Sequence, residues 1–272
     1  MKNPHQDVMR VLKETSRTFY IPVARLPERL QETVAAAYLC MRAIDEIEDH
    51  ETLDADTKAI LLRQVGLIMQ SQTTVNDRVL FELQAAFKPF ENVLPEVTLR
   101  VGEWALHPPS VIAPRIWDAT AAMADRMAQW VERNWEVRTE SDLDAYTYSV
   151  AGAVGLLLCD IWAWFDGSQI DRNSAISFGR GLQAVNILRN RDVDMQRQVD
   201  YYPRGWTREE MFRYARRNLE TARAGVDTMP RDAFTYLVEI PLLLAEATLD
   251  VLEAGQEKLS RLQVLRIVRQ AG

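Results

Sequence analysis

Two acidic side chains, four residues apart, close one of the apolar stretches of this sequence. Asp45 and Asp49 end the segment YLCMRAIDEIED, which begins at Tyr38. Residues four apart share one face of a helix, so the two carboxylates can hold a hard cation such as Mg²⁺. Glu48 stands at the edge of that face, and Arg42 precedes Asp45 by one turn, where its guanidinium suits a diphosphate oxygen. The alternative is an ordinary solvated helix end.

A second polar set lies on a mostly apolar segment, QAVNILRNRDVD. Its polar residues recur at helical spacing and form one stripe, with Arg189 beside it; the stripe is Gln183, Asn186, Asn190 and Asp194. Each polar group that is buried without a partner costs about 1–3 kcal/mol, so the stripe needs partners. We predict that it faces the Asp45 set across a cavity with Mg²⁺, water and diphosphate; a buried amide network between helices is the alternative.

Helices must position both sets. Apolar residues recur at three- and four-residue steps along nearly the whole chain, without the alternation that is typical of strands. The expected helices span about residues 5–18, 28–50, 55–72, 75–88, 95–106, 114–137, 141–165, 171–197, 207–228, 230–254 and 258–270. Ser141 is the expected N-cap of its helix, and Pro241 should kink or restart the helix around it.

Two of these helices are apolar over much of their circumference. They cover residues 146–165 and 182–195. Such helices are typical of the centre of a bundle, where other helices surround them. The sequence therefore predicts an all-α bundle around a central cavity, in a single domain over residues 1–272; a solid core is the alternative.

Charge and hydropathy exclude several classes of protein. The 272 residues carry a formal net charge of −7, so no basic excess is present for a general nucleic-acid surface. No uninterrupted run of 18 apolar residues occurs, and we expect no integral membrane segment. The N-terminus lacks the apolar core of a signal peptide. These features predict a cytoplasmic protein and leave its oligomeric state open.

Cysteines and histidines show no metal-binding spacing. Cys40 and Cys159 lie in apolar helical surroundings, which predicts two buried free thiols. His5, His50 and His107 are scattered near helix ends. We expect these histidines to be surface residues and not metal ligands.

Six blocks, in order, give the chain a resemblance to a known family. They are SRTF at 16–19, the segment 38–49, DAYTYSVAGAVG at 144–155, the segment 183–194, Tyr202-Pro203, and IPLLLAEATL at 240–249. With them the chain resembles the squalene/phytoene synthase family, the head-to-head trans-isoprenyl diphosphate synthases. The blocks span most of the chain and are specific as a set, although each alone is weak or moderate.

The resemblance implies an isoprenoid-synthase fold and a transferase that condenses two prenyl diphosphates through a cyclopropyl intermediate. It implies Mg²⁺, with Mn²⁺ as an alternative; the use of NADPH is undecided, and the greasy substrate leaves peripheral membrane contact open. Carried over by position, the metal ligands are Asp45, Glu48, Asp49, Asn186, Asn190 and Asp194, the substrate-binding residues are Ser16, Arg17, Phe19, Val150, Gly152, Gln183 and Asn186, and the catalytic residues are Tyr38, Arg42, Tyr146 and Arg189.

Two features of the 144–155 block bear on the chemistry. The face of Tyr146 can stabilise an allylic cation by up to ~2 kcal/mol, or its hydroxyl can relay a proton; an ordinary core tyrosine is the alternative. The small residues of the block, which include Gly152 and Gly155, fit a helix beside a pocket for a long chain. Close packing against another helix explains them equally well.

The second motif departs from the family pattern R-D-x-x-[ED]-D. Asn190 stands at the first aspartate, Val193 at the glutamate position, and Arg191 is an additional basic residue. Asp192 cannot replace Asn190, because two residues along a helix turn about 200°. This end of the site therefore loses at least one negative charge.

Three hypotheses follow from that departure. In the first, full head-to-head condensation is kept, with one weaker metal position. In the second, only one diphosphate is ionised, and the cation is captured by water, an internal double bond or a non-isoprenoid nucleophile. The third is a non-catalytic binding homologue, against which the intact Asp45/Asp49 pair argues.

Overall fold

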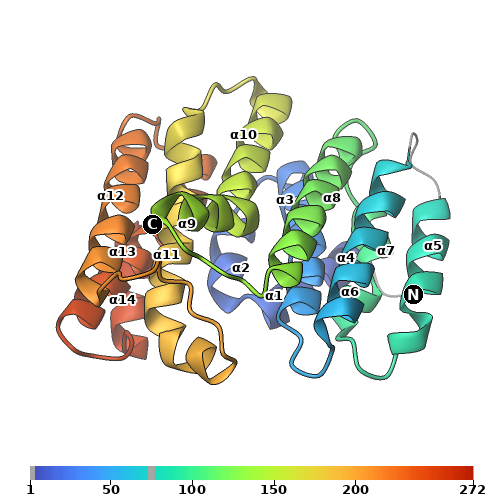
Figure 1. Ribbon diagram of the computed structural model, residues 1–272. Coiled ribbons are helices and arrows are strands. Elements are labelled where there is room, and N and C mark those ends of the chain that lie inside the picture. Colours follow the sequence, from blue (N-terminus) through green and yellow to red (C-terminus); the bar gives the residue numbers. More distant parts are fainter. Residues whose placement is uncertain (1–3, 73–76, 272) are drawn as a thin grey trace. The chain divides into compact units, whose positions relative to one another are not determined.

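The computed structural model describes residues 4–72 and 77–271 (Figure 1). Within these residues every regular element is a helix and none is a strand, which confirms the predicted all-α class. The chain divides into two compact units, of which the first comprises residues 1–134 with 163–167 and the second residues 135–162 with 168–272. The single-domain organisation over residues 1–272 stays a prediction.

The first unit is built around one long helix. Its elements are α1 (Pro4–Thr15), α2 (Arg17–Val23), α3 (Glu28–Glu48), α4 (Ala55–Gln70), α5 (Arg78–Phe87), the 3₁₀ turn η1 (Lys88–Phe90), α6 (Glu96–Leu99), α7 (Val101–Leu106) and α8 (Ala113–Glu132). Helix α3 packs against α1, α4, α6, α7 and α8, and α4 lies along α8. Because α3 is covered on most sides, it holds the first polar set on a rigid support.

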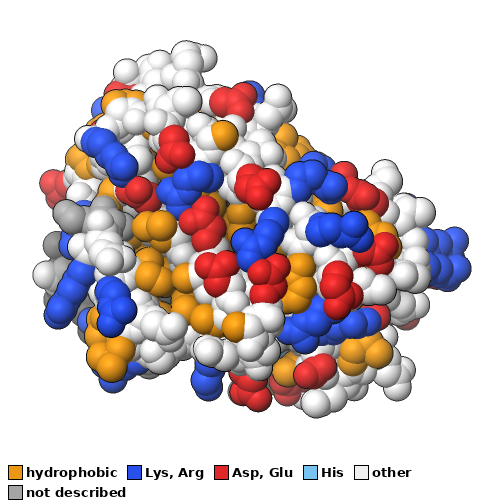
Figure 2. All heavy atoms as spheres, turned by 90° about the vertical axis from the view of Figure 1, so that its left-hand side faces the viewer, with side chains coloured by type: hydrophobic (Ala, Val, Ile, Leu, Met, Phe, Trp, Pro, Cys, Tyr) orange, Lys and Arg blue, Asp and Glu red, His pale blue; other side chains and the backbone are white. Residues whose placement is uncertain are grey.

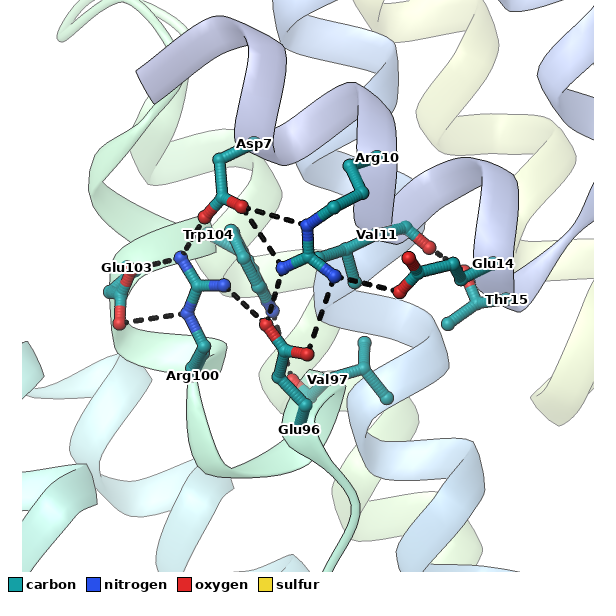
Figure 3. A network of polar contacts seen from close by, with 10 residues as sticks. All are labelled: Asp7, Arg10, Val11, Glu14, Thr15, Glu96, Val97, Arg100, Glu103 and Trp104. Carbon is teal, nitrogen blue, oxygen red and sulfur yellow. Dashed lines mark hydrogen bonds and ion pairs between the residues drawn. The ribbon is translucent and has the colours of Figure 1, made fainter. Parts of the chain in front are cut away.

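Charged side chains join α1 to α6 and the start of α7 (Figure 3). Arg100 donates to Asp7 at 2.5 Å, and Arg10 donates to Glu96 at 2.6 Å. Arg100 also lies over the ring of Trp104, with its guanidinium carbon 4.4 Å from the centroid. These contacts stabilise the position of the N-terminal helix in the unit.

The second unit contains a π-helical segment and four long helices. Its elements are α9 (Glu140–Thr147), the π-helix η2 (Tyr148–Gly152), α10 (Ala153–Asp166, whose last residues belong to the first unit), α11 (Arg172–Gln196), α12 (Arg208–Asp227), α13 (Ala233–Glu253) and α14 (Arg261–Ala271). Helix α11 lies along α12 and also packs against η2 and α13 (Figure 1). It is the central helix of this unit, as its apolar circumference predicts.

Glycines allow η2 and α10 to approach α11 closely. A Cβ atom on Gly155 would lie 2.1 Å from the carbonyl oxygen of Ala175, and one on Gly179 would lie 2.3 Å from that of Ala151. Cβ atoms in proteins do not lie so close to other heavy atoms. With any larger residue at Gly155 or Gly179, the two backbones could therefore not pack this closely. Of the two explanations for the small residues of this block, close helix packing is therefore observed directly.

Three local predictions need correction. Helix α9 begins at Glu140, because Thr139 and Asp142 form a reciprocal capping box and Ser141 is not the cap. Helix α13 runs through Pro241 as one element, so the helix does not restart there, and the alternative of a kink stays a prediction. The expected helix 5–18 is divided at Ser16, which ends α1 and caps α2.

The continuous helical stretch Glu140–Asp166 bears on membrane association. It has 27 residues and is long and apolar enough to cross a membrane by length and composition alone. The expected absence of an integral membrane segment stays a prediction, because length and composition alone do not decide it. About 44 % of the most apolar window is buried inside the protein, so the stretch gives only weak support for membrane association.

Ion pairs cover the side of the second unit that carries α12 to α14. Lys and Arg side chains are interspersed there with Asp and Glu (Figure 2). Arg216 pairs with Asp250 at 3.0 Å, and Arg223 pairs with Glu246 at 2.6 Å. This face therefore presents both signs of charge and not a continuous patch of one sign.

The thiols behave as predicted. Cys40 and Cys159 are both buried and free. Burial raises the pKa of each thiol, that of Cys159 to about 11. Both cysteines are therefore neutral residues of the core.

Candidate functional site

The first polar set occupies the last turns of α3. Arg42 donates to Asp45 at 2.5 Å and to Glu46, so one guanidinium bridges two carboxylates on its own helix. Asp49 is the C-cap residue, and its backbone N–H donates to the carbonyl of Asp45 at 2.9 Å. The helix therefore fixes the spacing of the two aspartates.

Electrostatic strain is concentrated at Asp45. Burial and the neighbouring charge of Asp49 raise the pKa of Asp45 to about 7, although Arg42 acts in the opposite direction. A buried carboxylate beside a second carboxylate is an arrangement that a bound cation relieves. The charge distribution thus fits a metal-binding role for this pair.

Glu48 differs from this pair in its burial. Its side chain is only 4 % exposed, whereas Asp49 is exposed. The ammonium group of Lys58, also buried, donates to the carbonyl oxygen of Glu48 at 2.7 Å. We therefore leave Glu48 out of the metal-ligand set proposed below.

The SRTF block forms the beginning of α2. The Ser16 hydroxyl accepts a hydrogen bond from the Phe19 N–H at 3.2 Å and so caps the helix. Phe19 stacks on Tyr38 of α3, with ring centroids 5.1 Å apart. Burial raises the pKa of Tyr38, and a hydrogen bond with Ser16 partly offsets this effect. The side chain of Arg17 lies outside the described residues. The block therefore has a clear structural role beside Tyr38.

Tyr146 lies at the end of α9 and is 3 % exposed. It stacks on Tyr201, with centroids 4.6 Å apart and ring planes inclined by 18°. The next residues, including Val150 and Gly152, form the π-helix η2, a form that is rare and frequent at functional sites. Tyr201 was not predicted from the sequence, because no local signal marks a partner 55 positions away.

The second polar set lies on α11 as predicted. Its four residues are all half-buried: Gln183, Asn186, Asn190 and Asp194. Asp192 and Val193 are exposed, the latter by 57 %. The stripe is therefore a distinct face of the helix, and Asp192 does not belong to it.

Arg189 links the two asparagines of the stripe. It donates to Asn186 Oδ1 at 2.9 Å and to Asn190 Oδ1 at 3.2 Å. Asn190 Nδ2 also donates to Asn186 Oδ1, at 3.0 Å. Both amide oxygens thus point toward one cation, the Arg189 guanidinium, and they form a ready set of neutral ligand oxygens.

Arg191, the additional basic residue of the motif, faces the segment that follows α11. Its Nη2 donates to Asp200 Oδ2 at 2.9 Å, and its guanidinium carbon lies 3.8 Å from the ring centroid of Tyr202. It fixes the segment that also carries Tyr201, the partner of Tyr146. Arg191 is therefore a supporting residue of the Tyr146 stack and is not directed at the stripe.

A further polar network holds the residues on either side of Tyr146 in the sequence, and the sequence did not predict it. Tyr214 of α12 donates to Asp144 Oδ1 at 2.8 Å and lies 3.0 Å from the hydroxyl of Thr147. Arg180 of α11 donates to the carbonyl oxygen of Asp144 at 3.2 Å. These bonds tie α9 to α11 and α12 on both sides of Tyr146.

An apolar pocket lies within the second unit, between α10, α11, α12 and α13. Its empty volume is about 330 Å³, part of which is open to solvent. Leu158, Phe178, Ala222 and Val238 are among its lining residues. Phe178 precedes Asn186 by eight residues on α11, which corresponds to about 12 Å along the helix axis. One helix thus carries both an apolar pocket and a polar stripe.

The structure therefore brings together the predicted residues of each unit. Tyr38, Arg42 and Asp45 cluster in the first unit, and Asn186, Arg189 and Asn190 cluster in the second. The convergence of the two polar sets on shared magnesium ions stays a prediction.

Comparison with known proteins gives a family match. Residues 12–213 match the family model described as squalene/phytoene synthase. The squalene synthase of Schizosaccharomyces pombe is 29% identical over 224 residues, which are 75% of this chain and 45% of the relative. That of Yarrowia lipolytica is 30% identical over 224 residues, 75% of this chain and 46% of the relative. The chain thus spans less than half the length of these curated relatives.

Solved structures agree with the fold. A complex of TcSQS with the ligand BPH1237 has a TM-score of 0.79 at 19% identity and covers 98% of this chain and 86% of that chain. Squalene synthase HpnC from Alicyclobacillus acidocaldarius has a TM-score of 0.58 at 16% identity, with coverage of 94% and 95%. These likenesses confirm the predicted isoprenoid-synthase fold. With the match to its family model over residues 12–213, the chain belongs to the squalene/phytoene synthase family.

Proposed function

We propose that this protein is a Mg²⁺-dependent prenyltransferase that ionises allylic prenyl diphosphates and joins two of them head-to-head. The product would be of the squalene or phytoene type, from farnesyl or geranylgeranyl diphosphate. Family membership supports the reaction class. One observation carries the proposal. Arg42, Asp45 and Asp49 share the end of α3, so a side chain that can bind phosphate lies next to two carboxylates that can bind a metal ion.

Each polar set by itself offers oxygen ligands for a hard divalent cation. In the first unit Asp45 and Asp49 offer carboxylate oxygens; in the second unit Asp194 offers a carboxylate, and Asn186 and Asn190 offer neutral amide oxygens. Oxygen-only sets of this kind suit Mg²⁺, and Mn²⁺ as an alternative. When bound, the metal would neutralise negative charge on the departing diphosphate.

Two arginines suit the phosphate oxygens. Arg42 has a buried Nε for which no hydrogen-bond partner occurs among the described residues. A phosphate oxygen would satisfy this donor, whereas the other nitrogens of Arg42 are held by Asp45 and Glu46. Arg189 is exposed and holds only neutral amides, so its charge is available to a second anion.

The apolar pocket suits the hydrocarbon tail. It is lined almost wholly by apolar side chains and lies about 12 Å along α11 from the polar stripe. A diphosphate at Asn186 and Asn190 would allow an extended prenyl chain to enter beside Phe178. Tyr146 would then present an aromatic face within the same unit, where it can stabilise an allylic cation.

The test is product analysis with matched variants. Purified protein is incubated with farnesyl or geranylgeranyl diphosphate and Mg²⁺, with and without NADPH, and the products are identified by mass. We expect a C30 or C40 hydrocarbon or its cyclopropyl diphosphate. Asp45→Asn should abolish diphosphate release, whereas Asp192→Asn should not, because Asp192 is exposed and lies off the stripe. Full activity in Asp45→Asn would refute the site.

A second function is favoured by one specific observation. The α11 stripe contains a single carboxylate, Asp194, and its two asparagines hold Arg189. Because the α11 stripe has so little negative charge to hold metal ions, we expect ionisation of only one diphosphate. The resulting cation would then be transferred to water, an internal double bond or another acceptor. Formation of only a C15 or C20 alcohol or cyclic terpene would establish this alternative and exclude head-to-head condensation.

A further inference from the structure

Two histidines and a carboxylate from three helices meet in the first unit. His5 lies in α1, Glu32 in α3, and His107 is the C-cap residue of α7. One ligand atom of each residue lies within 4.8 Å of the other two. The histidines lie near helix ends, as expected, but His5 and His107 are not scattered: their side chains and that of Glu32 are half-buried, and helix packing brings the three together.

We propose that His5, Glu32 and His107 form a binding site for a transition-metal ion of the Zn²⁺ or Co²⁺ type. Two imidazoles and a carboxylate are the ligands that such ions prefer, and three protein ligands leave a position for water. Mg²⁺ prefers six oxygens, so the site differs in chemistry from the Asp45 and Asp49 pair. Nothing in the proposed prenyl transfer requires it.

The hydrogen bonds of Gln31 fix the tautomer of His5. Gln31 Nε2 donates to the Val23 carbonyl at 3.2 Å, so its Oε1 must be the atom that lies 2.8 Å from His5 Nε2. An amide oxygen only accepts, and His5 Nε2 therefore carries the proton. The lone pair of the neutral ring then lies on Nδ1, which is 3.9 Å from Glu32 Oε1. Metal-binding histidines usually have such a second hydrogen bond.

His107 supplies the other nitrogen. Its Nε2 is buried and has no hydrogen-bond partner among the described residues, an unfavourable state that a bound cation would relieve. The His107 and His5 rings are nearly parallel, with centroids 6.4 Å apart.

Metal binding requires the three ligand atoms to move closer together by side-chain rotation. Ligand atoms of a tetrahedral zinc site lie roughly 3.4 Å apart, given Zn–N distances of about 2.0–2.1 Å. His5 Nδ1 and Glu32 Oε1 would approach by about half an ångström from their present 3.9 Å, and a pair at the 4.8 Å limit of the cluster by about 1.4 Å. A bound ion would then tie the N-terminal helix α1 to α3 and α7.

The test uses the full chain with Co²⁺ as the probe ion, in the presence of excess Mg²⁺, which occupies oxygen sites. We expect one Co²⁺ per chain by equilibrium dialysis and visible absorption bands of a tetrahedral, nitrogen-containing site. His107→Gln and Glu32→Gln should each weaken binding at least about 100-fold and abolish the bands. Gln31→Met should weaken binding about 10- to 100-fold, because it removes the bond that orients His5.

His50→Gln is the matched control. The His50 ring lies 3.0 Å from the Val93 carbonyl, outside the cluster, so this variant should bind Co²⁺ like the parent chain. Absence of Co²⁺ binding in the parent chain, or unchanged binding in His107→Gln, would overturn the proposal. If a variant fails to fold, carbethoxylation of the parent chain decides: Zn²⁺ should protect His5 and His107 and leave His50 reactive, and equal reactivity with and without Zn²⁺ would refute the site.

Discussion

The guanidinium of Arg191 lies over the ring of Tyr202, 3.8 Å from its centroid, and its Nη2 donates to Asp200. Arg191, the additional basic residue of the second motif, thus holds the segment that follows α11. That segment places Tyr201 on Tyr146. Arg191, which departs from the family motif, therefore supports the stack of Tyr146 and Tyr201 and is not directed at the polar stripe of α11.

Arg191→Ala should loosen this segment. The contacts are partly solvent-exposed, so we expect a loss of about 1 kcal/mol in the free energy of unfolding. Trypsin should also cleave faster after Arg197. Urea unfolding and timed proteolysis measure the two effects. Arg213→Ala removes the same charge from a side chain that is 76% exposed, and it should change neither quantity.

Gly179→Ala should destabilise the second unit. Its Cβ would lie 2.3 Å from the Ala151 carbonyl oxygen, so η2 and α11 must move apart, at a cost of about 1–3 kcal/mol. Thermal or urea unfolding measures this loss. Gly66→Ala in α4 is the control, since its Cβ would meet Ala121 at an ordinary 3.4 Å; it should be neutral or stabilising. Equal effects of both changes would contradict the packing argument.

The Asp7 network should make the stability of the protein depend on pH (Figure 3). The hydrogen bond from Arg100 lowers the pKa of Asp7, and that from Arg10 lowers the pKa of Glu96. A carboxyl whose folded pKa is depressed stabilises above its unfolded value of about 4, and this contribution is lost as the pH falls through the folded value. Asp7→Asn should therefore cost stability at pH 6 and progressively less toward pH 3.

Urea unfolding at several pH values between these limits checks that prediction. Glu220 is exposed, so Glu220→Gln should change stability by no more than about 0.5 kcal/mol at every pH. A constant difference between Asp7→Asn and the parent chain would show that the ion pairs contribute nothing.

Asn190→Asp should strengthen the metal position of the stripe. The change restores a carboxylate and removes the amide that donates to Asn186, which leaves the Asn186 oxygen freer to bind a cation. We expect half-saturation at a Mg²⁺ concentration about tenfold lower, equivalent to about 1.4 kcal/mol. Mg²⁺ titration of diphosphate release measures it. A higher requirement for Mg²⁺ in this variant would count against Asn190 as a ligand.

Ala222→Leu should shorten the accepted substrate. Ala222 lines the apolar pocket and is 1% exposed, so a larger side chain fills part of the 330 Å³. The ratio of kcat/KM for geranylgeranyl over farnesyl diphosphate should fall about tenfold, because the longer chain loses its space. Ala224→Leu, on the exposed side of the same helix, should leave the ratio unchanged.

Long, well-capped helices were predictable from the sequence. The starts of α4, α11 and α12 follow from Asp54, Asp171 and Thr207, whose side chains cap the first turn. The half-buried stripe of α11 also followed from helical spacing. Both signals are local, and local sequence determines caps and faces directly.

Features that depend on packing were not predictable. The break at Ser16, the division of the 95–106 helix at Arg100, and the π-helix η2 leave no mark in apolar periodicity. The meeting of His5 with His107, and of Arg191 with Tyr202, depends on how distant segments pack. A single sequence without tertiary contacts carries no signal for such pairs.

The π-helix η2 has a consequence for the register of the second unit. A π turn accommodates one more residue than an α turn, so if Tyr148–Gly152 wound as an ordinary α-helix, the following helix would be rotated by about 100°. Gly155 would leave its place opposite Ala175, and a bulkier side chain of α10 would arrive there. The π turn thus sets the rotation between α9, which carries Tyr146, and α10, which carries Gly155. Each helix can therefore face its own neighbours although the two are continuous.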